Sequence, residues 1–222
     1  MKYAAMAAAI FDMDGTLIDT MPVWRNAAAN YLSHLGVHVD PNLGTRFFDL
    51  TVVEAAEVIR NEFSVDLSIA EIEAGIFAEV GRSYREEAPF KPGAVEFVRL
   101  LARKQIPMCI VSSGSKPLIS AALERAGVLD CFTEIFGAAQ TGIDKRQPTM
   151  FMQAAELMGA EPVRTWVFED ALYAVRTVKP FGFRTVGIAD ELSAGMADQL
   201  AAEADLYWEE YPQQLPVEML GW

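Results

Sequence analysis

AAAIFDMDGTLIDT, residues 7–20, is an apolar run that leads into two carboxylates and a glycine. Residues 7–11 have the length and composition of a buried strand. Asp12 and Asp14 follow the run directly, and two carboxylates placed so closely repel each other. Either the pair caps a turn, or a positive group lies between the two side chains.

Further apolar runs follow along the chain, and several of them also end in polar residues. They occupy residues 106–115, 133–138, 164–170 and 183–190. Amphipathic segments separate most of these runs, and two of the segments stop at Gly127 and Gly159. Strands that alternate with helices predict a parallel sheet covered on both faces. Ligands of such sheets bind at the carboxyl ends of the strands, where this chain places its polar residues.

One interval, residues 21–88, shows only helical patterns. Apolar residues from Trp24 to Leu35 recur at helical spacing, and residues 52–63 predict a second helix. The sequence SIAE at 68–71 is a capping box that opens a third helix. We therefore expect a helical module inserted after the first strand. The sequence PFKPG at 89–93 marks the return to the α/β part of the chain.

Composition limits the classes of protein and partner. With 222 residues, 52% of them hydrophobic, the chain can bury a core as one large domain or a domain with an insertion. Its formal net charge of −13 argues against nucleic-acid and anionic-membrane partners. An anionic substrate would therefore need local positive groups or a metal. No run approaches the ~18 apolar residues of a membrane span.

The two cysteines, Cys109 and Cys131, make neither a disulfide framework nor a zinc site. Cys109 lies in an apolar run, which predicts a buried thiol. We therefore expect a protein of the reducing cytoplasm, and we expect it to be a monomer.

Polar residues from four parts of the chain are placed where one site can gather them. They are Asp12 with Asp14, the Ser112–Ser115 segment, Lys145, and Glu169 with Asp170. Asp12, Asp170 and Glu169 offer the hard oxygen ligands that suit Mg²⁺. The metal and Lys145 would let a phosphate dianion approach a carboxylate that otherwise repels it.

Such a set can carry out phosphoryl transfer. Asp12 would attack phosphorus and form an aspartyl-phosphate. Asp14 would protonate the leaving oxygen and later take a proton from water. Gly15 permits a sharp turn that aims backbone N–H groups at the phosphate. A serine hydroxyl after the second strand would donate a hydrogen bond to a transferring oxygen.

The motif FDMDGT resembles the nucleophile motif of the haloacid dehalogenase superfamily, in its phosphatase branch. The resemblance extends over nearly the whole chain, with the serine strand, lysine loop and acidic strand in family order, and is strongest to β-phosphoglucomutase-like and phosphoglycolate-phosphatase-like proteins. It implies a Rossmann-like core, residues 1–16 and 89–222, and an α-helical cap domain, residues 17–88. It also implies Mg²⁺-dependent hydrolysis of a small phosphorylated metabolite.

The resemblance also assigns roles to residues. Ser113, with Ser112 as the alternative, binds phosphate together with Gly114 and Lys145. Asp12, Asp14, Glu169 and Asp170 form the metal site, Asp14 through its backbone carbonyl. Three cap residues are candidates for substrate contact: Trp24, Arg25 and Arg46. The chain departs from the family pattern at Arg146 and Thr149 after the lysine, and at Ala171 and Ala174 after the acidic pair.

Three alternatives to a phosphatase remain. A mutase of the β-phosphoglucomutase type needs a cap histidine and a Ser-Arg pair, where this chain has Trp24 and Val52. A dehalogenase would use the aspartate nucleophile without metal, which leaves Asp14 and the acidic pair unexplained. A phospho-aspartate signalling domain also uses Asp, Ser and Lys, but such domains are about half this length and lack a helical insert.

Overall fold

The computed structural model describes residues 4–40, 42–48, 50, 52–137 and 143–221. The chain divides into two compact units, one of Met1–Asp19 with Pro89–Trp222 and one of Thr20–Ala88. We call the first the core unit and the second the cap unit. The start of the predicted lysine loop, residues 141 and 142, lies outside the described residues.

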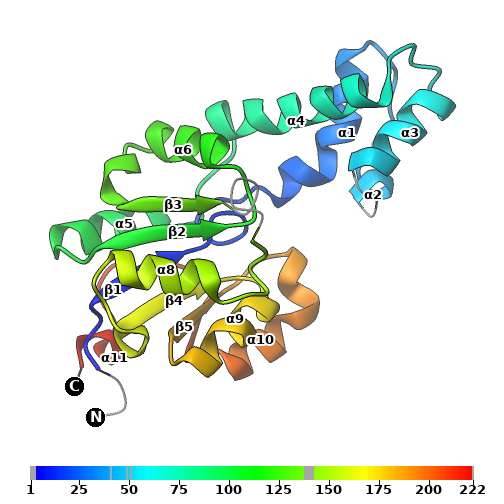
Figure 1. Ribbon diagram of the computed structural model, residues 1–222. Coiled ribbons are helices and arrows are strands. Elements are labelled where there is room, and N and C mark those ends of the chain that lie inside the picture. Colours follow the sequence, from blue (N-terminus) through cyan, green and yellow to red (C-terminus); the bar gives the residue numbers. More distant parts are fainter. Residues whose placement is uncertain (1–3, 41, 49, 51, 138–142, 222) are drawn as a thin grey trace. The chain divides into compact units, whose positions relative to one another are not determined.

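The core unit is built on a parallel sheet with the strand order β3-β2-β1-β4-β5-β6 (Figure 1). The strands are β1 (Ala8–Phe11), β2 (Met108–Ser112), β3 (Glu134–Gly137), β4 (Thr165–Glu169), β5 (Arg184–Ile188) and β6 (Leu206–Trp208). The predicted parallel sheet is confirmed, and the first five strands lie within predicted runs. The sequence did not predict β6, because three residues are too few for a periodic pattern.

Helices cover both faces of this sheet, as predicted. They are α5 (Ala94–Arg103), α6 (Lys116–Arg125), α8 (Thr149–Leu157), α9 (Leu172–Val178), α10 (Ala197–Glu203) and α11 (Val217–Leu220). Helix α8 packs on β1, β2 and β3, whereas α9 packs on β4 and β5. Gly127 and Gly159 follow α6 and α8 with φ of 64°, so both predicted stops are left-handed helix ends.

Side chains along β1 and β4 point alternately to the two faces of the sheet, so they contribute to two separate apolar layers. Ile10 and Val167 belong to one buried cluster, together with residues of α8 and α9. Their neighbours Phe11 and Phe168 stack on each other with ring centroids 4.3 Å apart, and Phe97 of α5 meets both rings edge-on. Successive strand residues point to opposite faces. The residues two positions beyond Ile10 and Val167 therefore continue on the α8–α9 face.

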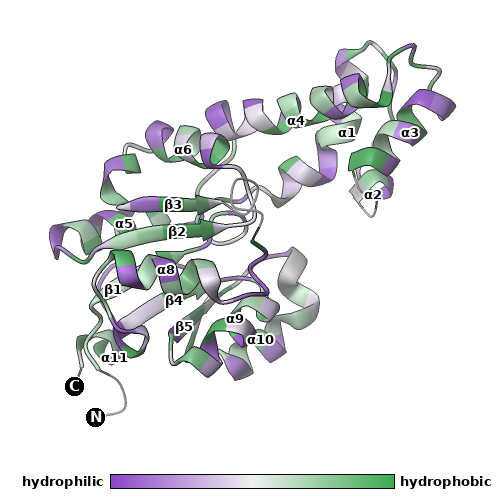
Figure 2. Ribbon diagram, viewed as in Figure 1, coloured by the Kyte–Doolittle hydropathy of each residue, from purple (hydrophilic) through white to green (hydrophobic). Residues whose placement is uncertain are grey.

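The described residues of the cap unit form helices and loops only. The helices are α1 (Met21–His34), α2 (Leu43–Phe48), α3 (Val52–Glu62) and α4 (Ile69–Glu86). The predicted capping box opens α4: the Glu71 N–H donates to Ser68 Oγ, and the Ser68 N–H donates to the Glu71 carboxylate. Helix α2 is too short for its period to be read. Figure 2 shows hydrophilic and hydrophobic residues alternating along α4, as expected of an amphipathic helix.

The chain passes between the two units twice, and the two passing segments contact each other within the core unit. The Asp19 N–H donates to the Pro89 carbonyl at 2.8 Å, and Ile18 bridges Phe90 in antiparallel fashion. Lys91 binds the Asp190 carboxylate at 2.6 Å. Residues 17–19, expected in the insert, therefore lie in the core unit.

Two further expectations concern the thiols and the helices. Cys109 is a free, fully buried thiol, and burial raises its pKa to about 11. None of the described helices combines the length and the apolar character that crossing a bilayer requires.

Candidate active site

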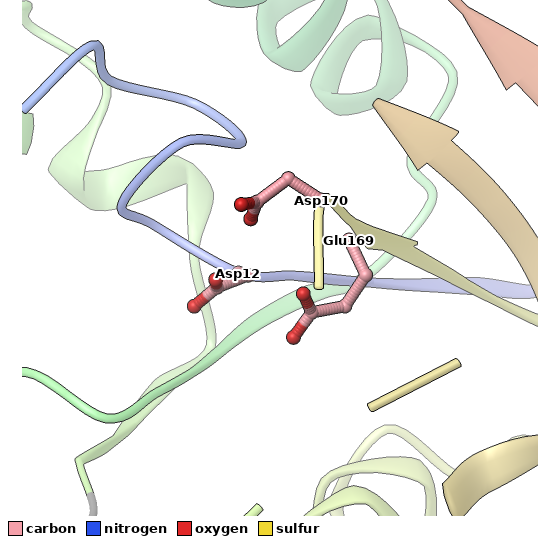
Figure 3. A group of neighbouring side chains, drawn as sticks. All are labelled: Asp12, Glu169 and Asp170. Atoms are coloured by element: carbon pink, nitrogen blue, oxygen red, sulfur yellow. The ribbon is translucent and has the colours of Figure 1, made fainter. Parts of the chain in front are cut away.

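Three carboxylates meet where β1 and β4 end. One oxygen from each of Asp12, Glu169 and Asp170 lies within 4.8 Å of the others. The side chains leave the ends of these two neighbouring strands (Figure 3). The register explains this, because β1 and β4 pair Phe11 with Phe168 and the Asp12 N–H donates to the Phe168 carbonyl at 3.0 Å. Asp12 and Glu169 are the residues that strand alternation directs to the α8–α9 face.

Lys145 lies against two of these carboxylates. Its Nζ is 2.9 Å from Asp12 Oδ1 and also forms an ion pair with Glu169. The lysine is only 2% exposed, and Glu169 is fully buried. Burial alone would lower the pKa of Lys145, but the charges of Asp12 and Glu169 outweigh burial and raise it. Lys145 is therefore a buried ammonium and not the surface lysine that its loop sequence also allowed.

The carboxylates exceed the positive charge available to them. In the described part of the chain, the ammonium of Lys145 contacts two of the three carboxyl groups, so negative charge exceeds positive charge in this cluster when all are ionised. Burial, followed by the charge of Asp12, raises the pKa of Glu169 to about 8 and that of Asp170 to about 7. Asp12 Oδ1 and Glu169 Oε1 are buried, and Lys145 Nζ is the cation that both of them contact. Such a set of oxygens fits a divalent cation.

The turn after β1 is shaped around Asp170. Gly15 has φ of 77°, and a Cβ on it would lie 2.6 Å from Asp170 Oδ2. The Thr16 hydroxyl donates to Asp170 Oδ1 at 3.0 Å, and the Tyr211 hydroxyl donates to the Thr16 carbonyl at 3.2 Å. Glycine is thus required both by the left-handed backbone and by the space that Asp170 fills.

Asp14 and the serine segment lie on a second side of the site. A Cβ on Gly114 would lie 3.4 Å from Asp14 Oδ2 and 3.3 Å from Ser112 Oγ, so the three residues are close together. Ser112 is buried, and its Oγ accepts the Gly114 N–H at 3.0 Å. Ser113 is exposed. Ser112 therefore supports its own loop, whereas the Ser113 hydroxyl is accessible.

The three cap candidates lie on α1 and α2 of the cap unit. Trp24 lines an apolar cavity of about 260 Å³ within the cap unit, and Phe77 meets its ring edge-on with centroids 6.3 Å apart. Arg46 is exposed and binds Glu62 at 2.6 Å. Arg25 is half-buried. Their roles toward a substrate stay predictions.

Sequence reasoning did not single out three residues around the site. Thr16 belongs to the motif FDMDGT, but the sequence predicted no role for it. Its hydroxyl contacts Asp170, which lies 154 residues away along the chain. Tyr173 lies in α9, shortly after Glu169 and Asp170. Its position just beyond the carboxyl end of β4 was the only feature of the sequence that could have marked it as a site residue. Tyr211 lies near the end of the chain, where no motif marks it.

Comparison with known proteins places this geometry in a family. Residues 6–182 match the family model of the haloacid dehalogenase-like hydrolases. The chain is 26% identical over 190 residues to the fructose-1-phosphate phosphatase YqaB of Escherichia coli, covering 84% of this chain and 98% of that protein. It is 26% identical over 180 residues to the bifunctional riboflavin kinase/FMN phosphatase of Arabidopsis thaliana, covering 81% of this chain but 47% of that protein.

Among solved structures, the fold matches a candidate β-phosphoglucomutase from Thermotoga maritima. The TM-score is 0.78 at 22% sequence identity, over 91% of this chain and 94% of the other. At this identity the match concerns the fold alone.

Proposed function

The chain belongs to the haloacid dehalogenase-like hydrolase family, as an enzyme of its phosphatase branch, and we propose that it hydrolyses a small phosphomonoester through an aspartyl-phosphate on Asp12. The observation that carries the proposal is the cluster of Asp12, Glu169, Asp170 and Lys145 at the ends of β1 and β4, in which all but the half-buried Asp170 are buried. A structural ion pair alone would not need two carboxylates beyond the one that Lys145 neutralises.

The proposed reaction has two displacements at phosphorus. In the first, a carboxylate oxygen of Asp12 forms a bond to phosphorus, the ester P–O bond breaks, and Asp14 gives its proton to the leaving alcohol oxygen. In the second, water attacks phosphorus, Asp14 takes the proton of that water, and the acyl-phosphate P–O bond breaks. Inorganic phosphate leaves, and Asp12 is again a free carboxylate.

Mg²⁺ is the proposed cofactor. Asp12, Asp170 and the backbone carbonyl of Asp14 would hold it, and the donor set consists of oxygens alone, as Mg²⁺ prefers. When bound, the ion would offset the carboxylate charge and the charge of the substrate phosphate. Glu169 has a second task, because its carboxylate binds Lys145 and accepts the Ala171 N–H at 3.0 Å. We propose that Glu169 orients Lys145 and completes the metal site.

Ser113, Gly114 and Lys145 are the proposed phosphate contacts. The accessible hydroxyl of Ser113 supports it over Ser112, whose Oγ already accepts the Gly114 N–H. Each donor aimed at the transferring phosphoryl oxygens is worth about 3 kcal/mol in the transition state. Lys145 supplies the positive charge that the chain's overall charge of −13 makes necessary.

A sugar-phosphate mutase of the β-phosphoglucomutase type is the second candidate, because the motifs of the chain also resemble those of such mutases. Trp24 and Val52 stand where the resemblance would require the mutase's cap histidine and the arginine of its Ser-Arg pair. We therefore propose hydrolysis, with a small sugar phosphate as the substrate class, as in the fructose-1-phosphate phosphatase relative. Trp24, Arg25 and Arg46 are the proposed cap contacts. The cytoplasmic location and the monomeric state stay predictions.

A panel of phosphomonoesters tests the function. With Mg²⁺, we expect release of inorganic phosphate from p-nitrophenyl phosphate and from one or more sugar phosphates, and we expect EDTA to abolish it. Added Mg²⁺ should restore the activity. Haloacid turnover that survives EDTA would instead indicate a dehalogenase. Interconversion of sugar 1- and 6-phosphates that is faster than phosphate release would indicate a mutase. A long-lived phosphoprotein that shows no turnover would indicate a signalling domain.

A further inference from the structure

Residues 89–91, here called the return segment, bring the chain back from the cap unit into the core unit. At its end, Lys91 Nζ lies 2.6 Å from Asp190 Oδ2 and donates to the Ala189 carbonyl at 3.1 Å. The side chain of Asp190 is 2% exposed and that of Lys91 is 14% exposed. Because separating two opposite charges inside a protein is costly, the ion pair fixes the end of the return segment.

The ion pair joins the return segment to the edge of the sheet at which the active site lies. Ala189 and Asp190 follow β5, and β5 pairs with β4 so that Gly187 lies opposite Glu169. The Ala189 N–H also donates to the Trp208 carbonyl of β6 at 2.8 Å. The loop that holds the ammonium is therefore bonded to the sheet and begins beside the acidic pair of the site.

The backbone of the return segment holds one residue of the turn after β1. The Lys91 N–H donates to the Leu17 carbonyl at 2.9 Å, and the Asp19 N–H donates to the Pro89 carbonyl at 2.8 Å. These two hydrogen bonds lie on either side of Ile18. The return segment therefore fixes the position of Ile18.

Ile18 in turn holds the backbone on both sides of Asp14. The Ile18 N–H donates to the Met13 carbonyl at 3.0 Å, and the Gly15 N–H donates to the Ile18 carbonyl at 2.9 Å. Asp14 itself forms a β-bridge with Ile18. Backbone hydrogen bonds therefore connect the proposed general acid to Lys91, and the ammonium of Lys91 connects them to the loop after β5.

We propose that Lys91 is a positioning residue for Asp14, one that acts through the return segment and Ile18. The inference rests on the proposed function, in which Asp14 protonates the leaving oxygen. Displacement of a reacting group by about 1 Å can cost a factor of 10² in rate, so the anchored turn keeps the acid within reach of that oxygen. Without the ammonium, the return segment keeps its backbone bonds to the turn but loses its ionic link to the sheet.

The dependence of the rate on the leaving group tests this role. p-Nitrophenol leaves with little help from an acid, whereas phenol, with a pKa of about 10, needs a proton. Lys91→Met should lower kcat/KM for release of phenol from phenyl phosphate about tenfold, and that for p-nitrophenyl phosphate less than threefold. Both esters carry the same phosphate group, so a change of local charge or a loss of structure affects them equally. The ratio of the two values therefore reports the acid.

Two further comparisons isolate the effect. Asp14→Asn alone should change the ratio at least as much as Lys91→Met does, and adding Lys91→Met to it should change the ratio less than twofold. Lys179→Met is the matched control, because Lys179 faces Asp205 at 3.9 Å in a Lys–Asp pair that precedes β5 and β6. This pair lies at the opposite ends of the two strands, so its loss should leave the ratio unchanged.

Thermal denaturation shows which variants fold. If Lys91→Met is unfolded, Asp190→Asn replaces it in the test, since asparagine removes the charge but keeps an acceptor for the ammonium. Its kcat/KM should fall at least twofold more for phenyl phosphate than for p-nitrophenyl phosphate.

Three results would overturn the inference: an equal loss for both esters in the folded variant, an equal change of the ratio in the Asp14→Asn background, or an equal change in Lys179→Met. Failure of the proposed function looks different, because the unsubstituted enzyme would then release phosphate from neither ester.

Discussion

Asp12→Asn is expected to lower kcat by about 10⁴-fold or more while the protein stays folded. The amide of asparagine has nearly the shape of the carboxylate but cannot attack phosphorus. The substitution also removes one of three carboxyl groups that lie within 4.8 Å of each other. In the absence of divalent metal, the free energy of unfolding should therefore be equal to or higher than that of the wild type.

The measurement combines steady-state kinetics on p-nitrophenyl phosphate with urea denaturation in EDTA. Asp130→Asn is the control, because Asp130 is exposed in a short helical turn far along the chain from the motif. It should change neither kcat nor stability. Substantial turnover by Asp12→Asn would contradict the assignment of the nucleophile. A large loss of stability would contradict the picture of crowded carboxylates.

Lys145→Met should have the largest effect on stability. Methionine fills a similar volume but removes the ammonium that lies 2.9 Å from Asp12 Oδ1 and pairs with Glu169. The carboxylates are then buried without a partner of opposite charge. Loss of one member of a buried ion pair typically costs about 3–5 kcal/mol. We expect a loss of this size in EDTA, together with a strong reduction of kcat because a phosphate contact is gone.

Two comparisons sharpen the lysine prediction. Lys116→Met breaks an ion pair with Glu134 in which both side chains are largely exposed, so it should cost less than about 1 kcal/mol. Asp12→Asn introduced into Lys145→Met should recover part of the lost stability, because one of the unpaired carboxylates disappears. If Lys145→Met were no more destabilising than Lys116→Met, the buried cluster would not have the energetics described here.

Much of the fold could be predicted because its signals are local. Apolar runs that end in Asp12, Ser112 and Glu169 indicate both a parallel sheet and the edge at which polar groups gather. Helix boundaries followed from equally local signals, such as the capping box at Ser68 and the left-handed Gly127. In contrast, β6 and α2 are too short to show a period, and tertiary contacts decide whether such segments become regular.

Pairings across the site could not be predicted from one sequence. The contact of Lys145 with Glu169 and that of Thr16 with Asp170 join positions distant along the chain. The sequence named Ser112 and Ser113 as alternatives. The hydrogen bond that Ser112 Oγ accepts from the Gly114 N–H supports the proposal of Ser113, and this bond depends on the arrangement of one turn. Tyr173 carries no motif, so its contact with the Arg146 guanidinium emerges only in three dimensions.

The central claim is that Asp12 carries the phosphoryl group, and trapping the intermediate tests it most directly. Asp14→Asn should slow hydrolysis of the aspartyl-phosphate, since water then lacks its base. With p-nitrophenyl phosphate, the first step needs little help from an acid, so the intermediate should accumulate. After acid quenching, peptide mass spectrometry should find one phosphoryl group on Asp12. A phosphoryl group on another residue, or continued release of p-nitrophenol with Asp12 unmodified, would contradict the account.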